Sequence, residues 1–357
     1  MNQPIETDAL VIGAGPVGLF QAFELGLLGI SSHIIDTLSY AGGQCIELYP
    51  DKPIYDIPGT VATTGRQLVA SLLEQLKPFK PVFHLSQQVN ALARQADGRF
   101  LVETSANPSS ASPSFLTKTI FIAAGVGAFQ PKKLTVHGLD TFAGTQLFYH
   151  LDAQTDFADN FVGKQVTIVG SEDVAVEAAI QLAKLPSKSI TLLHRRDVFN
   201  APPDKLETMR NLIATGKLQL RIGQIAGYEA HGVNQGQLTA LQVTDVDGKT
   251  APLPVNTLLV LQGLSPKLGP VADWGLDMAR KQLAVDTEKF ETNEAGIFAV
   301  GDINTYPGKK KLILCGFHEA ALASFAAASI VFPDTPTLLQ YTTTSTLLHQ
   351  RLGVTHS

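Results

Sequence analysis

The chain has 357 residues, a net charge of −5 at pH 7 and two cysteines, Cys45 and Cys315. The absence of a basic excess argues against nucleic-acid binding, and two distant cysteines exclude a disulfide framework, a CxxC redox pair and a cysteine-based zinc site. The N-terminus has no basic signal-peptide region, and the longest apolar stretch, residues 319–332, is too short to span a membrane. We therefore expect a cytoplasmic protein with no membrane partner and, at this length, two domains.

The N-terminal segment has the order strand, glycine loop, helix, strand and acid. Residues 8–29, DALVIGAGPVGLFQAFELGLLG, place Gly13, Gly15 and Gly18 between a strand and a helix, and the next strand ends in Asp36. The first glycine permits a tight turn, the second lets the backbone approach a pyrophosphate, and the third allows close packing of helix and strand. A carboxylate after the second strand accepts hydrogen bonds from ribose hydroxyls. This order predicts a dinucleotide-binding domain.

A second unit repeats this order after residue 164 but keeps only its first glycine. KQVTIVG, residues 164–170, is a strand that ends in Gly170 and is followed by Ser171 and a helical pattern. Gly170 supplies the turn, and Ser171 offers a backbone amide and a hydroxyl to a phosphate. Glu172 would oppose a pyrophosphate unless it points to solvent, and Asp173 is a candidate helix cap.

The second strand of this unit ends in basic residues where the first unit has an acid. These residues are His194, Arg195 and Arg196. Adjacent guanidinium groups form charge-assisted bonds to a 2′-phosphate, which a carboxylate would repel. The pattern therefore favours NADP(H) over NAD(H); the alternative is a solvated basic turn.

Three further strands indicate how the two units are connected. TIFIAAGVGAFQPKKL (119–134), TLLVLQGLSPKLG (257–269) and GIFAVGDI (296–303) mark where the chain leaves one nucleotide domain and returns. We predict an α/β fold of two Rossmann-like domains. The first nucleotide-binding domain is expected to comprise residues 1–128 and 287–357, and the second, residues 129–286, is inserted into it.

A family resemblance becomes specific at residues 41–59. Their sequence, AGGQCIELYPDKPIYDIPG, is similar to the signature of ferredoxin/flavodoxin–NADP+ reductases of the thioredoxin-reductase-like type, and the resemblance covers nearly the whole chain. It implies FAD in the first unit and NADPH in the second. Thioredoxin reductases share this scaffold but carry a CxxC pair, which this chain lacks. Family members often have GGGDSA where this chain has GSEDVA.

The resemblance also implies individual FAD contacts. Asp36 matches the acid on the adenosine ribose, Gln44 and Tyr49 match flavin contacts with the tyrosine ring stacked on the flavin, and Asp302 matches the aspartate on the ribityl chain. The remaining implied positions belong to the glycine loop, the adenine strand, the first crossover and the C-terminal segment: Gly13, Gly15, Pro16, Gly18, Val89, Phe129, Thr343 and Thr344. No catalytic side chain or metal is expected, because the chemistry belongs to the flavin.

The implied activity is that of an FAD-dependent ferredoxin (or flavodoxin)–NADP+ reductase, with hydride transfer to flavin N5 and single-electron transfer through a semiquinone. Lys309, Lys310 and Lys311, with Lys132 and Lys133, are candidates for docking an acidic carrier, although a solvated loop is the alternative. A homodimer is expected from the resemblance. Two other functions stay open: an NADPH-dependent quinone or diaphorase-type reductase, and a redox-sensing flavoprotein module.

Overall fold

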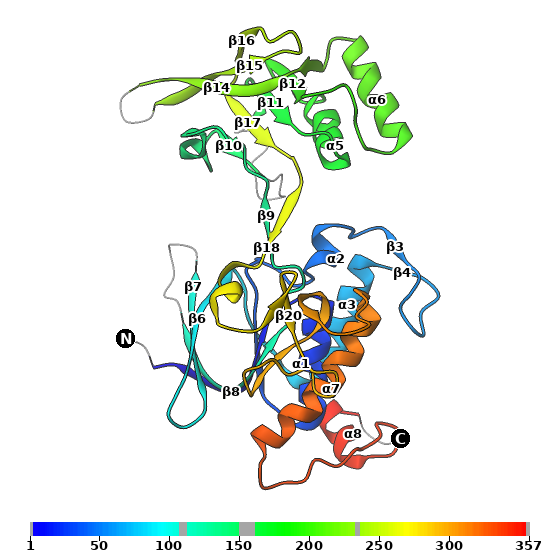
Figure 1. The fold of residues 1–357 in the computed structure, drawn as a ribbon. Helices are drawn as coiled ribbons and strands as arrows, with labels where there is room; N and C mark the ends of the chain where they lie inside the picture. Colours follow the sequence, from blue (N-terminus) through cyan, green and yellow to red (C-terminus); the bar gives the residue numbers. More distant parts are fainter. Residues whose placement is uncertain (1–2, 107–112, 150–160, 233–235, 355–357) are drawn as a thin grey trace. The chain divides into compact units, whose positions relative to one another are not determined.

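The computed structural model describes residues 3–106, 113–149, 161–232 and 236–354 and divides into two compact units (Figure 1). The first unit comprises Met1–Ala128 and Pro266–Ser357, and the second, Phe129–Ser265, is inserted between them. The chain passes from the first unit to the second in β9 (Ala128–Pro131) and returns in β18 (Leu264–Lys267). These two connecting strands pair with each other as a two-stranded sheet.

The return to the first unit comes after residue 265 rather than after residue 286, where the sequence placed it. Residues 266–286 belong to the first unit because they supply part of its core. Val271, Leu276 and Leu283 are buried there among the side chains of the sheet.

A seven-stranded sheet forms the centre of the first unit. Its order is β5-β2-β1-β8-β7-β6, and β21 also pairs with β8. The first part of β8 pairs antiparallel with β7, whereas its last three residues pair parallel with β21. The bounds are β1 (Ile5–Ile12), β2 (Ser32–Ile35), β5 (Val82–His84), β6 (Gln87–Arg94), β7 (Phe100–Ala106), β8 (Ser114–Ile122) and β21 (Ile297–Ala299).

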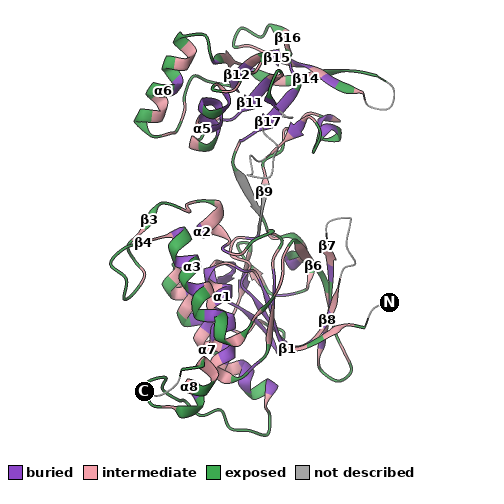
Figure 2. Ribbon diagram, turned by 180° about the vertical axis from the view of Figure 1, so that it is seen from behind, coloured by how far each residue is buried: buried purple, intermediate pink, exposed green. Residues whose placement is uncertain are grey.

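Both faces of this sheet are covered, so its central strands are apolar at consecutive positions. Ala9 and Val11 of β1 pack in the core with α1 (Pro16–Leu28), α3 (Gly65–Leu76) and α7 (Ile313–Val331), whereas Leu10 and Ile12 belong to the core on the other face. Figure 2 shows the buried strands beside these helices. The remaining elements of the unit are α2 (Gln44–Glu47), β3 (Pro53–Ile54), β4 (Thr63–Thr64), η1 (Lys77–Phe79), η3 (Gly269–Asp273), β19 (Met278–Ala279), β20 (Gln282–Ala284), η4 (Gly301–Ile303), β22 (Asn304–Thr305) and α8 (Thr346–Leu352).

Helix α7 is long and apolar enough to meet a length-and-hydropathy test for a membrane span. Its apolar character has a different origin in this fold. Ala320, Ala323 and Ala327 are fully buried, and the small side chains let α7 pack closely against α1. The helix is therefore part of the core of the first unit.

The second unit is built on a five-stranded parallel sheet of order β10-β17-β11-β12-β13. Helices α5 and α6 share a core with one face of it, and the antiparallel sheet β14-β15-β16 shares a core with the other. The bounds are η2 (Leu139–Phe142), β10 (Leu147–Phe148), β11 (Gln165–Val169), α5 (Asp173–Leu182), β12 (Ser189–His194), α6 (Pro203–Ala214), β13 (Gln219–Ile222), β14 (Gln224–His231), β15 (Gln237–Thr244), β16 (Thr250–Pro254) and β17 (Thr257–Val260).

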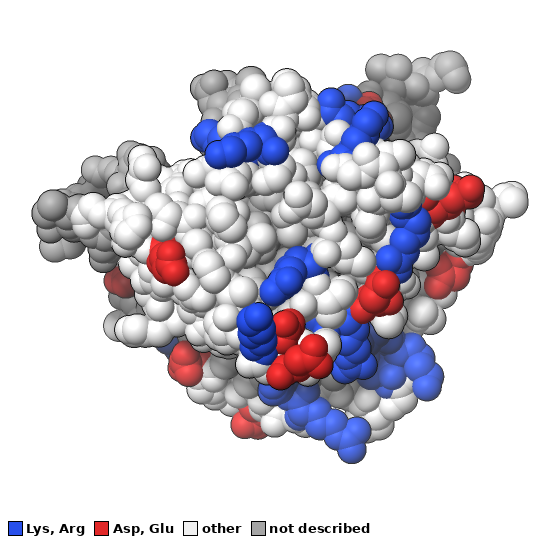
Figure 3. All heavy atoms as spheres, turned by 90° about the horizontal axis from the view of Figure 1, so that it is seen from above, with Lys and Arg blue, Asp and Glu red and all other residues white. Residues whose placement is uncertain are grey.

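Charged side chains of both signs are mixed on the face seen in Figure 3. Figure 3 shows lysines and arginines interspersed with acidic residues rather than gathered in one field. In the second unit, Arg210 pairs with Asp197 at 2.5 Å and Lys205 pairs with Asp173 at 2.9 Å. Exposed pairs of this kind contribute little to stability.

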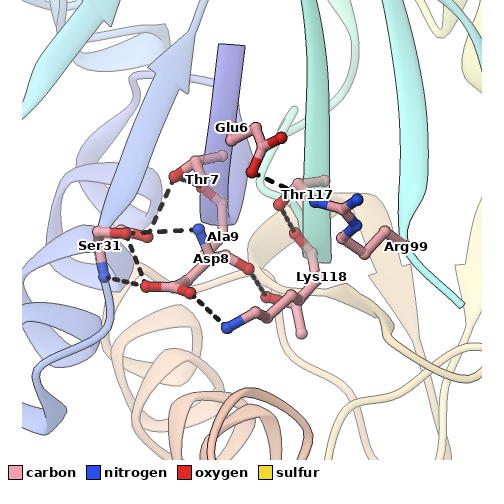
Figure 4. A network of polar contacts seen from close by, with 9 residues as sticks. Glu6, Thr7, Asp8, Ala9, Ser31, Arg99, Thr117 and Lys118 are labelled. Carbon is pink, nitrogen blue, oxygen red and sulfur yellow. Dashed lines mark hydrogen bonds and ion pairs between the residues drawn. The ribbon is translucent and has the colours of Figure 1, made fainter. Parts of the chain in front are cut away.

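A polar network ties together strands β1 and β8 and the segment before β2 in the first unit (Figure 4). The Asp8 carboxylate accepts hydrogen bonds from the Ser31 hydroxyl at 2.7 Å and from the Lys118 ammonium at 2.8 Å. Burial raises the pKa of Asp8, but the hydrogen bonds from Lys118 and Ser31 together lower it by more than burial raises it. The pKa of Asp8 is therefore below its ordinary value. The ionised carboxylate thus joins these segments on the side of the sheet away from the glycine loop, which follows the last residue of β1.

Candidate functional site

The glycine loop after β1 is shaped by close backbone contacts. A β-carbon on Gly13, whose φ is +113°, would lie 2.4 Å from the Ala123 carbonyl oxygen, and one on Gly18 would lie 1.9 Å from the Gly13 carbonyl oxygen. A β-carbon on Gly15 would meet only Gly43, at 4.0 Å. Gly15 caps α1 without a side chain and Pro16 begins the helix, so the first amide groups of α1 are left for an anion.

Asp36 links the loops that follow β1 and β2. Its carboxylate accepts the Ala14 amide at 2.6 Å and the Leu38 amide at 2.9 Å. Burial raises the pKa of Asp36, while these backbone bonds oppose the rise. A carboxylate has about four acceptor sites, so two amide bonds leave capacity for ribose hydroxyls.

Three segments distant in sequence meet at Gln44. The Gln44 amide nitrogen donates to Asp302 at 3.2 Å, and a β-carbon on Gly125 would lie 3.0 Å from the same nitrogen. A β-carbon on Gly43 would lie 3.0 Å from the Cα of Gly15. Bare backbone at three glycines, with an amide and a carboxylate beside them, fits a cofactor that carries a diphosphate and a polar chain, as FAD does.

Tyr49 contacts Cys45 and is close enough to Asp302 to feel its charge. Its hydroxyl is 3.7 Å from the Cys45 sulfur, and burial, then Cys45 and the Asp302 charge, raise its pKa well above the ordinary value. Burial also raises the pKa of the Cys45 thiol. Both groups are therefore neutral at pH 7, and the tyrosine ring can offer a flat, uncharged surface.

The turn that carries Asp302 is held by a buried carboxylate that sequence reasoning missed. Glu319 of α7 accepts the Gly301 amide at 2.7 Å, the Asn304 side-chain amide at 2.8 Å and the Tyr306 hydroxyl at 2.9 Å. The Lys309 ammonium also pairs with Glu319 and donates to the Gly301 carbonyl at 2.9 Å. The only signal in the sequence was a single glutamate in an apolar, alanine-rich helix.

This network corrects the assignment of Lys309 to a docking surface. The Lys309 side chain is 6% exposed and that of Glu319 is 0% exposed, so this charge is turned into the protein. Lys310 and Lys311 are exposed. Adjacent lysines on an irregular segment point in different directions, which a run of letters does not reveal.

The other implied flavin contacts have different placements. Val89 is buried in β6, and the first residue of that strand, Gln87, donates its amide to the Asp36 carbonyl at 2.9 Å. Phe129 falls in β9, and its side chain lies outside the described residues.

Thr343 and Thr344 are not brought to Gln44 within one chain. They are exposed and precede α8, whose Arg351 donates to the Leu27 carbonyl at the far end of α1. The glycine loop is at the other end of this 13-residue helix, about 20 Å away. Figure 1 likewise places α8 and α2 at opposite ends of the unit.

A cavity of about 500 Å³ lies along the carboxyl edge of the parallel sheet in the second unit. Of the residues that the sequence predicted to bind NADPH, Gly170, Ser171, His194 and Arg195 line this cavity, whereas Arg196 does not. The lining residues that sequence reasoning missed are Val169 and Leu193, near the ends of β11 and β12, and, after β9, β13 and β17, Leu134, Thr135, Val136, Gly223, Gln224, Ile225 and Gln262. Lys132 and Lys133, which the sequence suggested for docking, also line this cavity.

Glu172 lines the same cavity but is held by a neighbouring loop. The Asn200 side chain donates to the Glu172 carboxylate at 2.7 Å, and the Asn200 amide donates to the Ser171 carbonyl at 2.8 Å. The predicted capping role of Asp173 is wrong, because Glu172 occupies the N-cap and Asp173 bonds to Lys205. No side chain caps α5, so its first amides remain open to a phosphate.

Comparison with known proteins agrees with this geometry. Residues 7–324 match the family model described as pyridine nucleotide-disulphide oxidoreductase. A protein of Polaromonas sp. JS666 named ferredoxin–NADP reductase is 58% identical over 354 residues, which are 98% of this chain and 93% of that protein. Ferredoxin–NADP reductase 2 of Cupriavidus metallidurans is 56% identical over 99% of this chain and 93% of its own length.

The chain belongs to the ferredoxin–NADP reductase family. Solved structures with the same fold include Lactococcus lactis thioredoxin reductase, at 22% identity and a TM-score of 0.58 over 92% of this chain and 99% of that one. Bacillithiol disulfide reductase of Bacillus cereus matches at 17% identity and a TM-score of 0.61 over 91% and 99%. The predicted α/β fold of two Rossmann-like domains is thereby confirmed.

In this family member, replacing Lys309 tests the buried network. Lys309→Met should lower the free energy of unfolding of the first unit by about 3 kcal/mol, because it leaves the Glu319 carboxylate buried without its cation. Urea unfolding followed by fluorescence, together with retention of FAD on gel filtration, measures the effect. Lys310→Met is the matched control and should change stability by less than about 0.5 kcal/mol; equal losses in the two variants would contradict the network.

Proposed function

We propose that the protein is a cytoplasmic, FAD-dependent ferredoxin–NADP+ reductase that passes electrons between NADPH and ferredoxin. The contrast between the two units carries this proposal: one glycine loop is paired with Asp36, and the other opens on a cavity lined by Arg195. The near full-length likeness to proteins named ferredoxin–NADP reductase supports the choice of acceptor.

In the first unit, the residues around Gln44 bind and orient FAD. The amides at the start of α1 would hold the diphosphate, the Asp36 carboxylate would accept hydrogen bonds from the adenosine ribose hydroxyls, and Asp302 would accept them from the hydroxyls of the ribityl chain. Tyr49 would offer its neutral aromatic ring to the flavin. Once bound, FAD supplies the group that accepts a hydride from NADPH and releases electrons singly.

In the second unit, Arg195 and His194 recognise the 2′-phosphate of NADPH. Both lie at the end of β12 and line the cavity, and the His194 ring bonds the Arg196 carbonyl at 2.9 Å. This bond supports the turn that presents Arg195. Arg196 contributes positive charge near the cavity without lining it.

Rapid mixing of the anaerobic, oxidised holoenzyme with NADPH and with NADH tests the function. NADPH should bleach the flavin absorbance much faster than NADH does, because only NADPH carries the phosphate that the Arg195 turn recognises. Adding oxidised ferredoxin should then reoxidise the reduced flavin and allow turnover.

Two outcomes would contradict this assignment. Faster reduction of a quinone with no gain from ferredoxin would instead indicate the small-acceptor reductase. A negligible response to both nucleotides would indicate the redox-sensing module.

We propose that Lys310 and Lys311 help to dock ferredoxin or flavodoxin. The net charge of −5 does not favour an acidic partner, so docking would rest on a local patch. These two exposed lysines follow Lys309, whose ammonium contacts the Gly301 carbonyl next to Asp302. The patch would thus lie near the flavin.

The double variant Lys310→Gln/Lys311→Gln should raise KM for ferredoxin several-fold at low salt, because charges at the rim of an interface act mainly on association. The difference should vanish near about 0.5 M salt, and reduction of ferricyanide by NADPH should not change. Lys188→Gln/Lys217→Gln in the second unit alters the net charge equally and serves as the control. A similar KM in both double variants would exclude the patch.

We further propose a homodimer in which residues 336–345 of one subunit reach the FAD of the other. Leu338, Leu339 and Tyr341 are 72%, 65% and 65% exposed, and Thr343 and Thr344 lie far from the Gln44 of their own chain. An exposed apolar segment of this kind is typical of an interaction surface.

Sedimentation of the holoenzyme should therefore give a dimer at micromolar concentration. Leu338→Asp/Leu339→Asp should shift it toward monomer, because the new carboxylates would have to be desolvated in the interface. Val61→Asp, at a site that is 95% exposed, should leave the dimer intact. A monomeric wild-type protein would refute the proposal.

A further inference from the structure

One part of the lining of the cavity in the second unit comes from the segment that follows β9, the first of the two connections between the units. Residues 132–136 follow β9 directly and line the cavity together with residues at the ends of the parallel strands. The Lys132 amide donates to the Gly263 carbonyl at 3.0 Å, and the preceding residue, Gln262, also lines the cavity. Lys132 therefore lies beside the segment that follows β17.

The position of Lys132 along the sheet separates it from Arg195. Strands β17, β11 and β12 are consecutive neighbours, and Arg195 follows β12. Two strand spacings amount to about 10 Å. In a sheet of this order, a dinucleotide lies across the carboxyl ends of the strands, with its diphosphate at the glycine loop between these two positions.

Some of the charged side chains that line the cavity already have bonding partners within the protein. Lys133 bonds to Asp140 at 2.8 Å, and the Glu172 carboxylate accepts the Asn200 amide. Lys132 is exposed and lines the cavity, so its ammonium can turn toward a ligand. The N-cap residue of α5, Glu172, lines the same cavity, and no side chain caps this helix, so its first amides attract a diphosphate.

We propose that Lys132 binds the diphosphate of the nicotinamide nucleotide and adds affinity that does not depend on the 2′-phosphate. Arg195 then supplies the discrimination for NADPH. This assignment rests on the proposed function only in that the cavity holds NADP(H). It also moves Lys132 from carrier docking to nucleotide binding.

Titration calorimetry of the oxidised holoenzyme with NADP+ and with 2′-AMP separates these roles, because 2′-AMP carries the 2′-phosphate but no diphosphate. Lys132→Gln should weaken NADP+ binding by about tenfold, the effect of one charge-assisted phosphate contact, and leave 2′-AMP binding unchanged. Arg195→Gln should weaken both. Lys188→Gln, just before β12 at the opposite edge of the sheet, should weaken neither.

Each remaining outcome is decisive. Unchanged NADP+ affinity in Lys132→Gln would overturn the proposal. Equal losses for NADP+ and 2′-AMP would overturn it as well, because the lysine would then contact the 2′-phosphate. A wild-type protein that binds neither ligand would instead refute the proposed NADPH site. With more salt, the affinity of Lys132→Gln for NADP+ should fall less steeply than that of the wild type.

Discussion

Both nucleotide loops depend on one constraint. The first glycine of each loop lies in close contact with a backbone carbonyl oxygen just after the strand that neighbours it in the sheet. A β-carbon on Gly13 would lie 2.4 Å from the Ala123 oxygen, and one on Gly170 would lie 2.3 Å from the Leu261 oxygen. In each unit, the oxygen belongs to the residue after the neighbouring parallel strand, β8 or β17. A side chain at either glycine would push strand and loop apart and move the start of the helix that follows.

This constraint explains why the second loop keeps its first glycine and loses the others. The position equivalent to Gly18 is Ala175, which is fully buried, and a methyl group there still allows close packing of helix and strand. The position equivalent to Gly15 is Glu172. Packing does not restrict that position, because a β-carbon on Gly15 would meet only Gly43, at an ordinary contact distance of 4.0 Å, and in the second unit Asn200 holds the carboxylate.

Buried polar groups place the functional side chains of the first unit. Glu319 binds a backbone amide, a side-chain amide, a hydroxyl and an ammonium around the turn of Asp302. Such a network is costly to break once it is removed from water. It holds Asp302 near Gln44, from a segment more than 250 residues away in sequence, which is what the proposed binding of FAD requires.

The sequence by itself determined the class of fold, the two glycine loops and the acidic or basic end of each second strand, because local hydrogen-bonding and steric rules act over a few residues. Only the tertiary structure decided which neighbouring charges serve which site. Lys309 is buried while Lys310 is exposed, Arg195 lines the cavity while Arg196 does not, and Lys132 lies beside the segment that follows β17. It also placed residues 266–286 in the first unit. The physical reason is that the direction of a side chain and the boundary of a core depend on contacts between segments far apart in the chain, and a linear pattern does not record those contacts.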